Sequence, residues 1–456
     1  MVARKTEKTN KDAIFEAKKA KGKKASKMKS KSKHIYRAKN VNHIYLEGLC
    51  KTISGKSIAV GIDVAKEDFV GVLMDESERV ELTFKWKHPT QTYEMLTFID
   101  RLTEEASEVE VAMEPTGTYG DSIRFQLLNR QIPVYQVSAK HVHDMSEVYD
   151  GVPSQHDAKS SAIIAKLHRE GRSSFWDTET DVERALKAAI GTMVMYDGQY
   201  RDNINRLEAF LARYWPEATT IFDLDSTTLL TVLEQYGGPR QVTKNAQEAN
   251  KLMKKVGRHF LKLQKIDALL SSARTSLGAS MLEEEAEAVR LAASDTLRAK
   301  KAKNKAQLRV EKIGFEYKSI AAMGKAVGKA TAAVVVANLG DPENFDNAAS
   351  YLKCAGMNLK ERSSGKYEGQ LKITKRGSGI VRKYLFLAAM RMIQKDPLLA
   401  SWYKRKVARD GGKSKMRALV AVMRKLLKGL WYVGHYGVDF DSSQLVSVRH
   451  LSMENT

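Results

Sequence analysis

The chain has 456 residues, and its 76 Lys and Arg outnumber its 54 Asp and Glu to give a formal net charge of +22. A hydrophobic content of 43% is enough to bury more than one core, so we expect two or three domains. The basic balance is typical of proteins that bind nucleic acid. No stretch has the roughly 18 apolar residues of a membrane span, and no apolar segment follows the basic N-terminus as in a signal peptide.

The two cysteines, Cys50 and Cys354, are far apart and have no metal-ligand residues around them. We therefore expect a reduced cytoplasmic protein without structural zinc. Residues 1–54 are expected to form a basic, largely disordered arm, because residues 1–40 hold 15 Lys or Arg and only 3 acids. Such an arm could bind phosphate or could only keep the protein soluble, and the sequence leaves both open.

An apolar run containing one acid follows the arm, with the sequence IAVGIDVAKEDFVGVLM over residues 58–74. It predicts two antiparallel strands joined by a polar turn at 65–68, with Asp63 in the first strand. An ionised Asp in such a strand needs a partner, several hydrogen bonds or a cation, which suggests a metal. The alternative is an Asp at a strand end that accepts hydrogen bonds from turn N–H groups.

Three further strands and three helices are expected before residue 177. Glu114 lies at the C-terminal end of one strand, where open α/β sheets place their ligands. Asp157 lies in the first turn of the last helix, a position that the helix dipole also favours. The order of antiparallel strands followed by helix-linked strands predicts an α/β, RNase H-like sheet. The expected elements are strands at 80–87, 108–114 and 133–137, and helices at 91–105, 119–130 and within 154–170.

The order of the three acids indicates their chemistry. An Asp on the first strand, a Glu ending the fourth and an Asp opening a later helix would bring Asp63, Glu114 and Asp157 together on divalent ions. Two Mg²⁺ or Mn²⁺ ions held this way can activate the attacking oxygen and neutralise the leaving oxygen in phosphodiester chemistry.

The motifs GIDVAKEDF, AMEPTGTYG and HDAKSSAIIAKL resemble the DEDD-type, RuvC-like domain of the insertion-sequence one-ten family of transposases, relatives of the Piv/MooV DNA invertases. The resemblance implies that residues 55–177 form this catalytic domain. The family has a fourth acid three positions after the third, where this chain has Ser160. A hydroxyl is a poor direct Mg²⁺ ligand, although it can orient a metal-bound water. Three nearby acids are possible substitutes, namely Asp121, Asp144 and Asp150.

Residues 178–318 change to long, charge-rich helices. Four residues keep an apolar stripe at helical spacing, and Pro216 follows it; they are Ile204, Leu207, Leu211 and Tyr214. Two more helical regions are expected at 244–270 and 281–315. Their length predicts a coiled-coil arm, which could join subunits or could form a hairpin within one chain.

Residues 319–437 are expected to form a second, mostly α-helical domain, followed by a tail at 438–456. Two glycines precede an Ala/Val-rich helix within 320–339, either to approach phosphate or to pack helices tightly. Residues 353–391 then hold ten Lys or Arg and two Glu, with Ser364 in a polar loop. A serine among cations is suited to attack phosphorus, but loops that only contact phosphate use the same residues.

This basic segment resembles the family's C-terminal transposase domain, in which a serine before glycine becomes covalently linked to DNA. Ser364 matches that serine, and Ser363 is its unmatched neighbour. Because the surrounding loop offers no Asp or His, Ser364 would depend on the carboxylate–metal cluster for activation. We assign nucleic-acid contacts to six cations of this segment, namely Lys366, Lys372, Lys375, Arg376, Arg382 and Lys383.

The resemblance covers about residues 55–435 and implies a DNA recombinase of an insertion sequence. Such enzymes use a noncoding bridge RNA to select target and donor DNA, act as homo-oligomers and associate with the prokaryotic nucleoid when bound to DNA. Two other functions fit the same residues. One is a nuclease or Holliday-junction resolvase that uses metal alone, and the other is an inactive nucleic-acid-binding protein with Ser160 as the lesion.

Overall fold

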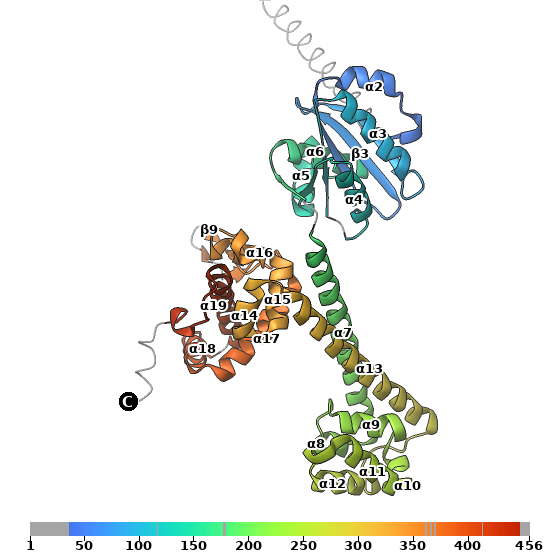
Figure 1. The fold of residues 1–456 in the computed structure, drawn as a ribbon, viewed down its shortest axis with the longest axis vertical. Coiled ribbons are helices and arrows are strands. Elements are labelled where there is room, and N and C mark those ends of the chain that lie inside the picture. The colour runs from blue at the N-terminus through green and yellow to red at the C-terminus, as the bar shows by residue number, and fades with distance from the viewer. Residues whose placement is uncertain are drawn as a thin grey trace, which may run out of the picture. The chain divides into compact units, whose positions relative to one another are not determined.

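The computed structural model describes residues 36–115, 117–176, 179–360, 371–412 and 414–446, together with the backbone of residues 363–364 and 367–368. The chain divides into two compact units, the first ending at Thr178 and the second starting at Glu179 (Figure 1). Among the described helices, none is long and apolar enough to cross a membrane.

The described part of the first unit is built on a mixed sheet of seven strands in the order β1-β4-β3-β2-β5-β6-β7. The strands β2, β3 and β4 form an antiparallel meander, β5 and β6 run parallel to β2, and β7 is antiparallel to β6. The bounds are β1 Lys39–Asn40, β2 Ser57–Asp63, β3 Asp68–Asp75, β4 Val80–Lys87, β5 Glu108–Met113, β6 Val134–Val137 and β7 Ser173–Phe175.

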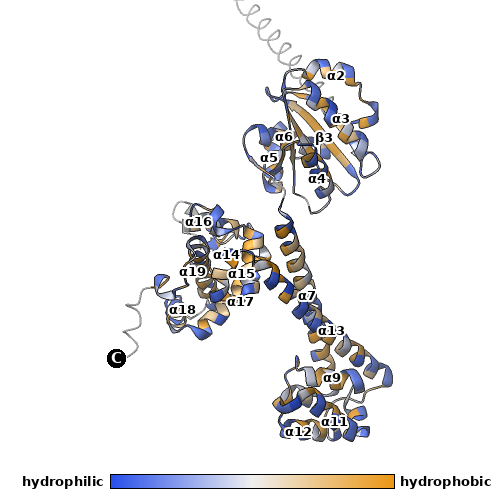
Figure 2. Cartoon of the chain, viewed as in Figure 1, coloured by the Kyte–Doolittle hydropathy of each residue, from blue (hydrophilic) through white to orange (hydrophobic). Residues whose placement is uncertain are grey.

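Helices cover both faces of this sheet. One face carries α2, α3 and α4, whose apolar residues share a core with alternate residues of β2, β4 and β5. The other face carries α6, which packs on β2 and β3 and is flanked by α5. Figure 2 shows the strands as the most apolar part of this unit, as expected for a sheet covered on both sides. The helices are α2 Leu46–Ile53, α3 Thr92–Glu105, α4 Asp121–Asn129, α5 Ala139–Asp150 and α6 Asp157–Arg169.

The boundary of the basic arm differs between sequence and structure. The sequence prediction includes residues 36–54 in the arm, whereas the structure has them in β1, a 3₁₀ turn (Val41–His43) and α2. The strand β1 pairs with β4, and the side chains of Val41 and Ile53 are buried in the core. The few apolar residues of this stretch therefore complete the first unit.

The described part of the second unit is helical, apart from four two-residue strands. Its two longest helices, α7 and α13, pack against each other within the chain, which corresponds to the intrachain hairpin considered from the sequence (Figure 1). The region expected as one helix at 244–270 is instead two helices, because α11 ends at Gly257 and Arg258 has a positive φ of 48°. The bounds are α7 Asp181–Tyr214, α8 Pro216–Ile221, α9 Thr227–Tyr236, α10 Pro239–Lys244, α11 Ala246–Gly257, α12 Leu263–Arg274 and α13 Glu283–Gly314.

Two apolar cores lie along the α7–α13 pair. One joins α8–α12 to parts of α7 and α13. The other joins the C-terminal helices to the first turns of α7 and the end of α13. Gly324 of α14 lies against the backbone of Lys329, which fits the helix-packing role of that glycine. The C-terminal helices are α14 Lys318–Val327, α15 Lys329–Leu339, α16 Ala348–Cys354, α17 Gly379–Lys395, α18 Pro397–Arg409 and α19 Lys415–Tyr436.

Ser364 lies in a two-residue paired strand rather than in the expected loop. The strand β8 (Leu359–Lys360) pairs antiparallel with β11 (Lys372–Ile373), and β9 (Ser363–Ser364) pairs antiparallel with β10 (Tyr367–Glu368). Ser364 is the last residue of β9 and lies opposite Tyr367. The Ser364 side chain and Lys366 lie outside the described residues.

Candidate active site

Asp63 and Glu114 lie side by side at one edge of the sheet. Asp63 is the last residue of β2, and Glu114 follows the last residue of β5. These strands are parallel neighbours, and Ile62 of β2 is in register with Met113 of β5. Since adjacent strands are only about 4.8 Å apart, the next residue on each strand brings the two carboxylates together.

Both carboxylates belong to the face of the sheet that α6 covers. A Cβ at Gly61 would lie 2.2 Å from the backbone oxygen of Ser161 in α6, so residue 61 faces that helix. Side chains alternate along a strand, so Asp63 faces the same way. On β5, Ala112 packs with α6 while Met113 belongs to the core on the opposite face, so Glu114 also faces α6.

The start of α6 completes the group. Asp157 lies in its first turn, and one turn later the Ser160 side chain hydrogen-bonds to Asp63. The Ser161 hydroxyl donates to the Val70 oxygen of β3 over 2.9 Å and to the Asp157 oxygen over 2.7 Å, which fixes the helix on the sheet. Because Gly61 has no side chain, α6 lies directly on β2 and its first turn comes close to Asp63.

The electrostatics of Asp63 reflect this convergence. Burial and, after it, the charges of Asp157 and Glu114 together raise the pKa of its carboxyl to about 6. The hydrogen bond from Ser160 and one from the Val64 N–H oppose this rise because they favour the ionised form. Three acids that repel one another at a strand end form a site that a cation would stabilise.

The carboxylates of Asp63, Glu114 and Asp157 are near one another, but their oxygens do not converge on one point as metal ligands do. In the part of the chain that the structure describes, no group of three or more His, Cys, Asp or Glu side chains is placed to hold a metal ion. The donor chemistry nevertheless fits a hard divalent cation, because every acid in the group offers carboxylate oxygens.

The neighbouring acids considered as substitutes for a fourth carboxylate have other partners. Asp150 accepts from the Lys159 ammonium over 2.7 Å and from the Tyr36 hydroxyl over 2.8 Å. Asp144 pairs with Lys140, and Asp121 lies 3.9 Å from Arg124. None of the three is among the charges that raise the pKa of Asp63. The residue whose side chain hydrogen-bonds to Asp63 is instead Ser160.

Lys159 is a site residue that the sequence did not single out. Its side chain is only 1% exposed, and its ammonium donates to Asp150 and to the backbone oxygens of Val152 and Ser154. It thereby fastens the segment between α5 and α6 beneath the first turn of α6. A lysine in a helix usually extends into solvent, so only its position between Asp157 and Ser160 gave a hint.

The cations assigned to nucleic acid in the second unit fall into two groups. Lys372, Lys375 and Arg376 are exposed. The backbone that carries them is held firmly, since the Lys375 N–H donates to the Gly356 oxygen over 2.9 Å and Lys375 has a positive φ of 57°. Lys372 is carried by the paired strand β11, and Lys375 and Arg376 by the loop that follows it, so all three cations face solvent from a fixed backbone.

Arg382 and Lys383 have partners within the protein. The Arg382 guanidinium donates to the backbone oxygens of Ala355 and Gly377. The Lys383 ammonium lies 2.7 Å from a carboxylate oxygen of Asp197 in α7, which also pairs with Lys303 of α13. These two cations therefore stabilise the fold of the second unit, whatever else they contact.

Comparison with known proteins places these features in one family. Residues 60–216 match a transposase model of the DEDD type from IS110 elements, and residues 321–404 match the transposase family IS116/IS110/IS902. Together the two matches cover more than half of the chain. The chain belongs to the IS110 family of transposases. An uncharacterised 43.6 kDa protein of insertion element IS110 from Streptomyces coelicolor is 24% identical over 318 residues, which cover 67% of this chain and 76% of that protein.

Membership in the IS110 family implies the general activity of a transposase, which is the cleavage and transfer of DNA. The first matched segment contains Asp63, Glu114, Asp157 and Ser160, and the second contains Ser364 with the basic residues after it. The DEDD type also suggests the use of a divalent metal. The family resemblance read from the sequence is thus confirmed.

Proposed function

We propose that the transposase is a site-specific recombinase of an insertion sequence and that Asp63, Glu114 and Asp157 hold divalent cations during strand cleavage. The observation that carries this proposal is the position of Asp63 and Glu114 at the ends of the neighbouring parallel strands β2 and β5, beside the first turn of α6 with Asp157. A strand-end carboxylate kept among like charges is costly unless a cation compensates it.

An RNase H-like fold for the first unit is part of the proposal. If β2 is counted as the first strand, the central part of the sheet has the strand order 3-2-1-4-5, and strands 1, 2 and 3 form an antiparallel meander. Asp63 and Glu114 end its two central parallel strands, where open α/β sheets place ligands.

Bound Mg²⁺ or Mn²⁺ would neutralise the carboxylates and activate an oxygen for attack on phosphorus. In this site the residues of the chain have separate tasks. Asp63, Glu114 and Asp157 would hold the ions, Ser160 would orient Asp63 through its hydrogen bond, and Lys159 would keep the first turn of α6 in place.

Ser364 is the proposed nucleophile. Its hydroxyl oxygen would form a bond to a DNA phosphorus while the bond from that phosphorus to one sugar oxygen breaks. The serine gives up its proton, and the released sugar oxygen gains one and leaves as a hydroxyl. Exposed Lys372, Lys375 and Arg376 support this role, because cations stabilise charge on a transferring phosphoryl group.

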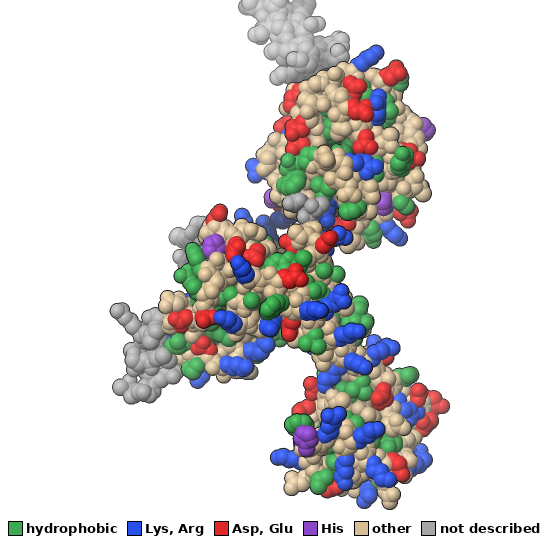
Figure 3. Space-filling view, in the orientation of Figure 1, with side chains coloured by type: hydrophobic (Ala, Val, Ile, Leu, Met, Phe, Trp, Pro, Cys, Tyr) green, Lys and Arg blue, Asp and Glu red, His purple; other side chains and the backbone are tan. Residues whose placement is uncertain are grey.

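Sequence choice is proposed to come from a noncoding bridge RNA that pairs with target and donor DNA, with the protein acting as a homo-oligomer. A protein of net charge +22 suits this division of tasks, since it can bind phosphate backbones while base pairing selects the sequence. On the face shown in Figure 3, Lys and Arg side chains are spread over the helices of the second unit.

The test is to trap the reaction on DNA and map the modified residue by mass spectrometry. Wild-type protein should carry DNA on Ser364, and Ser364→Ala and Asp63→Ala should carry none. Ser363→Ala is the matched control and should keep the adduct. Metal-dependent cleavage without any adduct would instead indicate a nuclease that uses metal alone, and binding without cleavage would indicate an inactive nucleic-acid-binding protein.

A further inference from the structure

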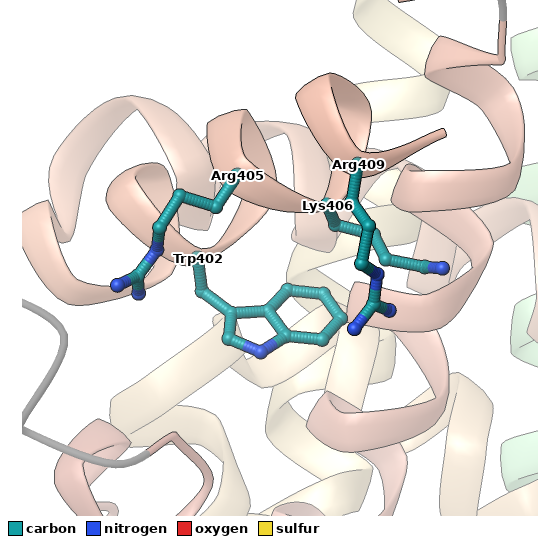
Figure 4. A pocket seen from close by; sticks show the side chains of 4 residues that line it. All are labelled: Trp402, Arg405, Lys406 and Arg409. Atoms are coloured by element: carbon teal, nitrogen blue, oxygen red, sulfur yellow. The ribbon is translucent and has the colours of Figure 1, made fainter. Parts of the chain in front are cut away.

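A basic cavity with an aromatic wall lies on α18 of the second unit. It has a volume of about 230 Å³ and is lined by Trp402, Arg405, Lys406 and Arg409 (Figure 4). Arg405 and Lys406 lie three and four positions after Trp402, and Arg409 lies four and three positions after them, so all four residues share one face of α18. The cavity is smaller than the sites that enclose drug-sized ligands, so it has room only for a small group.

The indole ring of Trp402 is held in position by a cation from α19. The Lys425 ammonium lies 5.1 Å from the ring centroid, and it donates a hydrogen bond of 2.6 Å to the Leu445 oxygen. A ring fixed in advance loses little conformational entropy when a planar ligand stacks on it. Trp402 also packs at the border of the C-terminal core but keeps part of its surface exposed.

The charge of the cavity is positive on balance. Lys406 is paired with Asp410 over 3.1 Å. Arg409 is exposed and has no carboxylate partner among the described residues. In Figure 4 the guanidinium groups of Arg405 and Arg409 lie on either side of the Trp402 ring. Cations flanking an aromatic ring can bind the phosphates on either side of a stacked base.

We propose that this cavity binds one unpaired nucleotide of a single strand, with the base stacked on Trp402 and a flanking phosphate on Arg409. The strand is RNA or displaced DNA, since both supply a base and a phosphate. A duplex does not fit this role because its bases already stack on one another and present only their edges in the grooves. The inference rests on the proposed function, since it assumes that the protein handles single strands.

The test is a binding measurement on the full chain in the presence of a metal chelator, so that catalysis plays no part. Fluorescence anisotropy would be followed with labelled oligouridine, oligothymidine and a DNA duplex. Trp402→Ala should weaken single-strand binding about 5- to 150-fold and leave duplex binding unchanged. Arg409→Ala should reduce the slope of the salt dependence by about 0.7 for a single strand.

Two controls keep the result specific. Lys404→Ala removes an exposed cation from the same helix outside the cavity, so it should not change the preference for single strands over duplex. Trp402→Phe keeps an aromatic ring and should retain most of the affinity. If Trp402→Ala fails to fold, Arg409→Ala at the exposed end of the helix still decides the question.

Weaker binding of oligouridine by Trp402→Ala would show that the cavity binds RNA, and weaker binding of oligothymidine would show that it binds single-stranded DNA. Equal losses with single strands and duplex, or no loss with any probe, would overturn the inference. The outcome is separable from the proposed function. If Trp402→Ala binds single strands normally and wild-type protein forms the Ser364 adduct, only the proposed role of the cavity is wrong. If Trp402→Ala binds single strands weakly and wild-type protein forms no adduct, only the proposed recombinase mechanism is wrong.

Discussion

The side chain of Ser160, three positions after Asp157 on α6, hydrogen-bonds to the carboxylate of Asp63. The bond favours the ionised form of Asp63 and so opposes the effect of burial and of Asp157 and Glu114. A hydroxyl at this position therefore lowers the cost of keeping three carboxylates together, without adding a fourth negative charge to the site.

The first prediction changes this hydroxyl. Ser160→Ala should raise the pKa of Asp63 further, because the opposing hydrogen bond is lost, and Ser160→Asp should bind Mg²⁺ more tightly, because it adds a carboxylate ligand. Carboxyl titration by NMR and calorimetry of Mg²⁺ binding measure the two effects. Ser154→Asp adds the same charge outside the cluster and should leave Mg²⁺ affinity unchanged. Unchanged affinity in Ser160→Asp would mean that another group already fills the fourth position.

The second prediction follows from the pKa of Asp63, which is about 6 in the folded protein and 3.8 ordinarily. The folded state holds this proton more tightly than the unfolded state, so the group stabilises the protein fully below about pH 3.8. That contribution is lost as the pH rises through about 6. It is on the order of 1–3 kcal/mol at a partly exposed site.

Urea unfolding between pH 4 and 7 with a chelator present measures this loss. Asp63→Asn keeps the shape of the side chain without its charge, so it should flatten the dependence and be more stable than wild type near pH 7. Added Mg²⁺ should restore stability to wild type and not to Asp63→Asn. The same pH dependence in both proteins would show that Asp63 does not titrate as described.

The elements that carry the carboxylates could be predicted because their signals are local. The apolar run around Asp63 and the alternation at 80–87 set β2, β3 and β4 almost to the residue. The position of Glu114 beside Asp63 followed from the rule that parallel strands end at the same edge of the sheet.

Features that depend on distant partners could not be predicted. Residues 36–54 are polar enough to resemble the arm, and they are ordered only because β4 and α3 offer them a surface. Arg382 and Lys383 count as basic residues in the sequence, but the partner of Lys383 is Asp197, 186 positions earlier. The burial of Lys159 likewise depends on the segment after α5, which the sequence did not identify as a helix end.

The third prediction concerns Lys159. Lys159→Met should lower the free energy of unfolding by roughly 2–3 kcal/mol, somewhat less than for a fully buried pair because Asp150 keeps some exposure. It should also weaken Mg²⁺ binding, because the first turn of α6 loses its support. Denaturant unfolding and calorimetry measure these effects. Lys166→Met removes a half-exposed pair with Glu78 from the same helix and should cost under about 1 kcal/mol.

The fourth prediction concerns the contact between α6 and β2. A Cβ in Gly61→Ala would meet backbone atoms of Ser161 and Ala165, so α6 must move away at a cost of about 1–3 kcal/mol. The separation should bring the pKa of Asp63 down toward 3.8, because Asp157 moves away and water enters. Gly198→Ala is the control, since nothing lies within 4 Å of a Cβ there and alanine should stabilise α7 by about 0.5–1 kcal/mol. An unchanged Asp63 pKa in Gly61→Ala would show that the contact does not set the site.

The last prediction separates the arm from the fold by two truncations. Residues 1–35 contain 13 Lys or Arg and 3 acids, so deleting them should flatten the salt dependence of DNA affinity by roughly 0.9 for each phosphate that the arm contacts. The melting temperature should stay the same. Deleting residues 1–54 also removes β1 and α2 and uncovers the core around Val41 and Ile53, so it should destabilise the first unit. Affinity measured across salt concentrations, with calorimetric melting of both variants, distinguishes the two effects. An unchanged salt slope after deletion of residues 1–35 would mean that the arm makes no phosphate contacts.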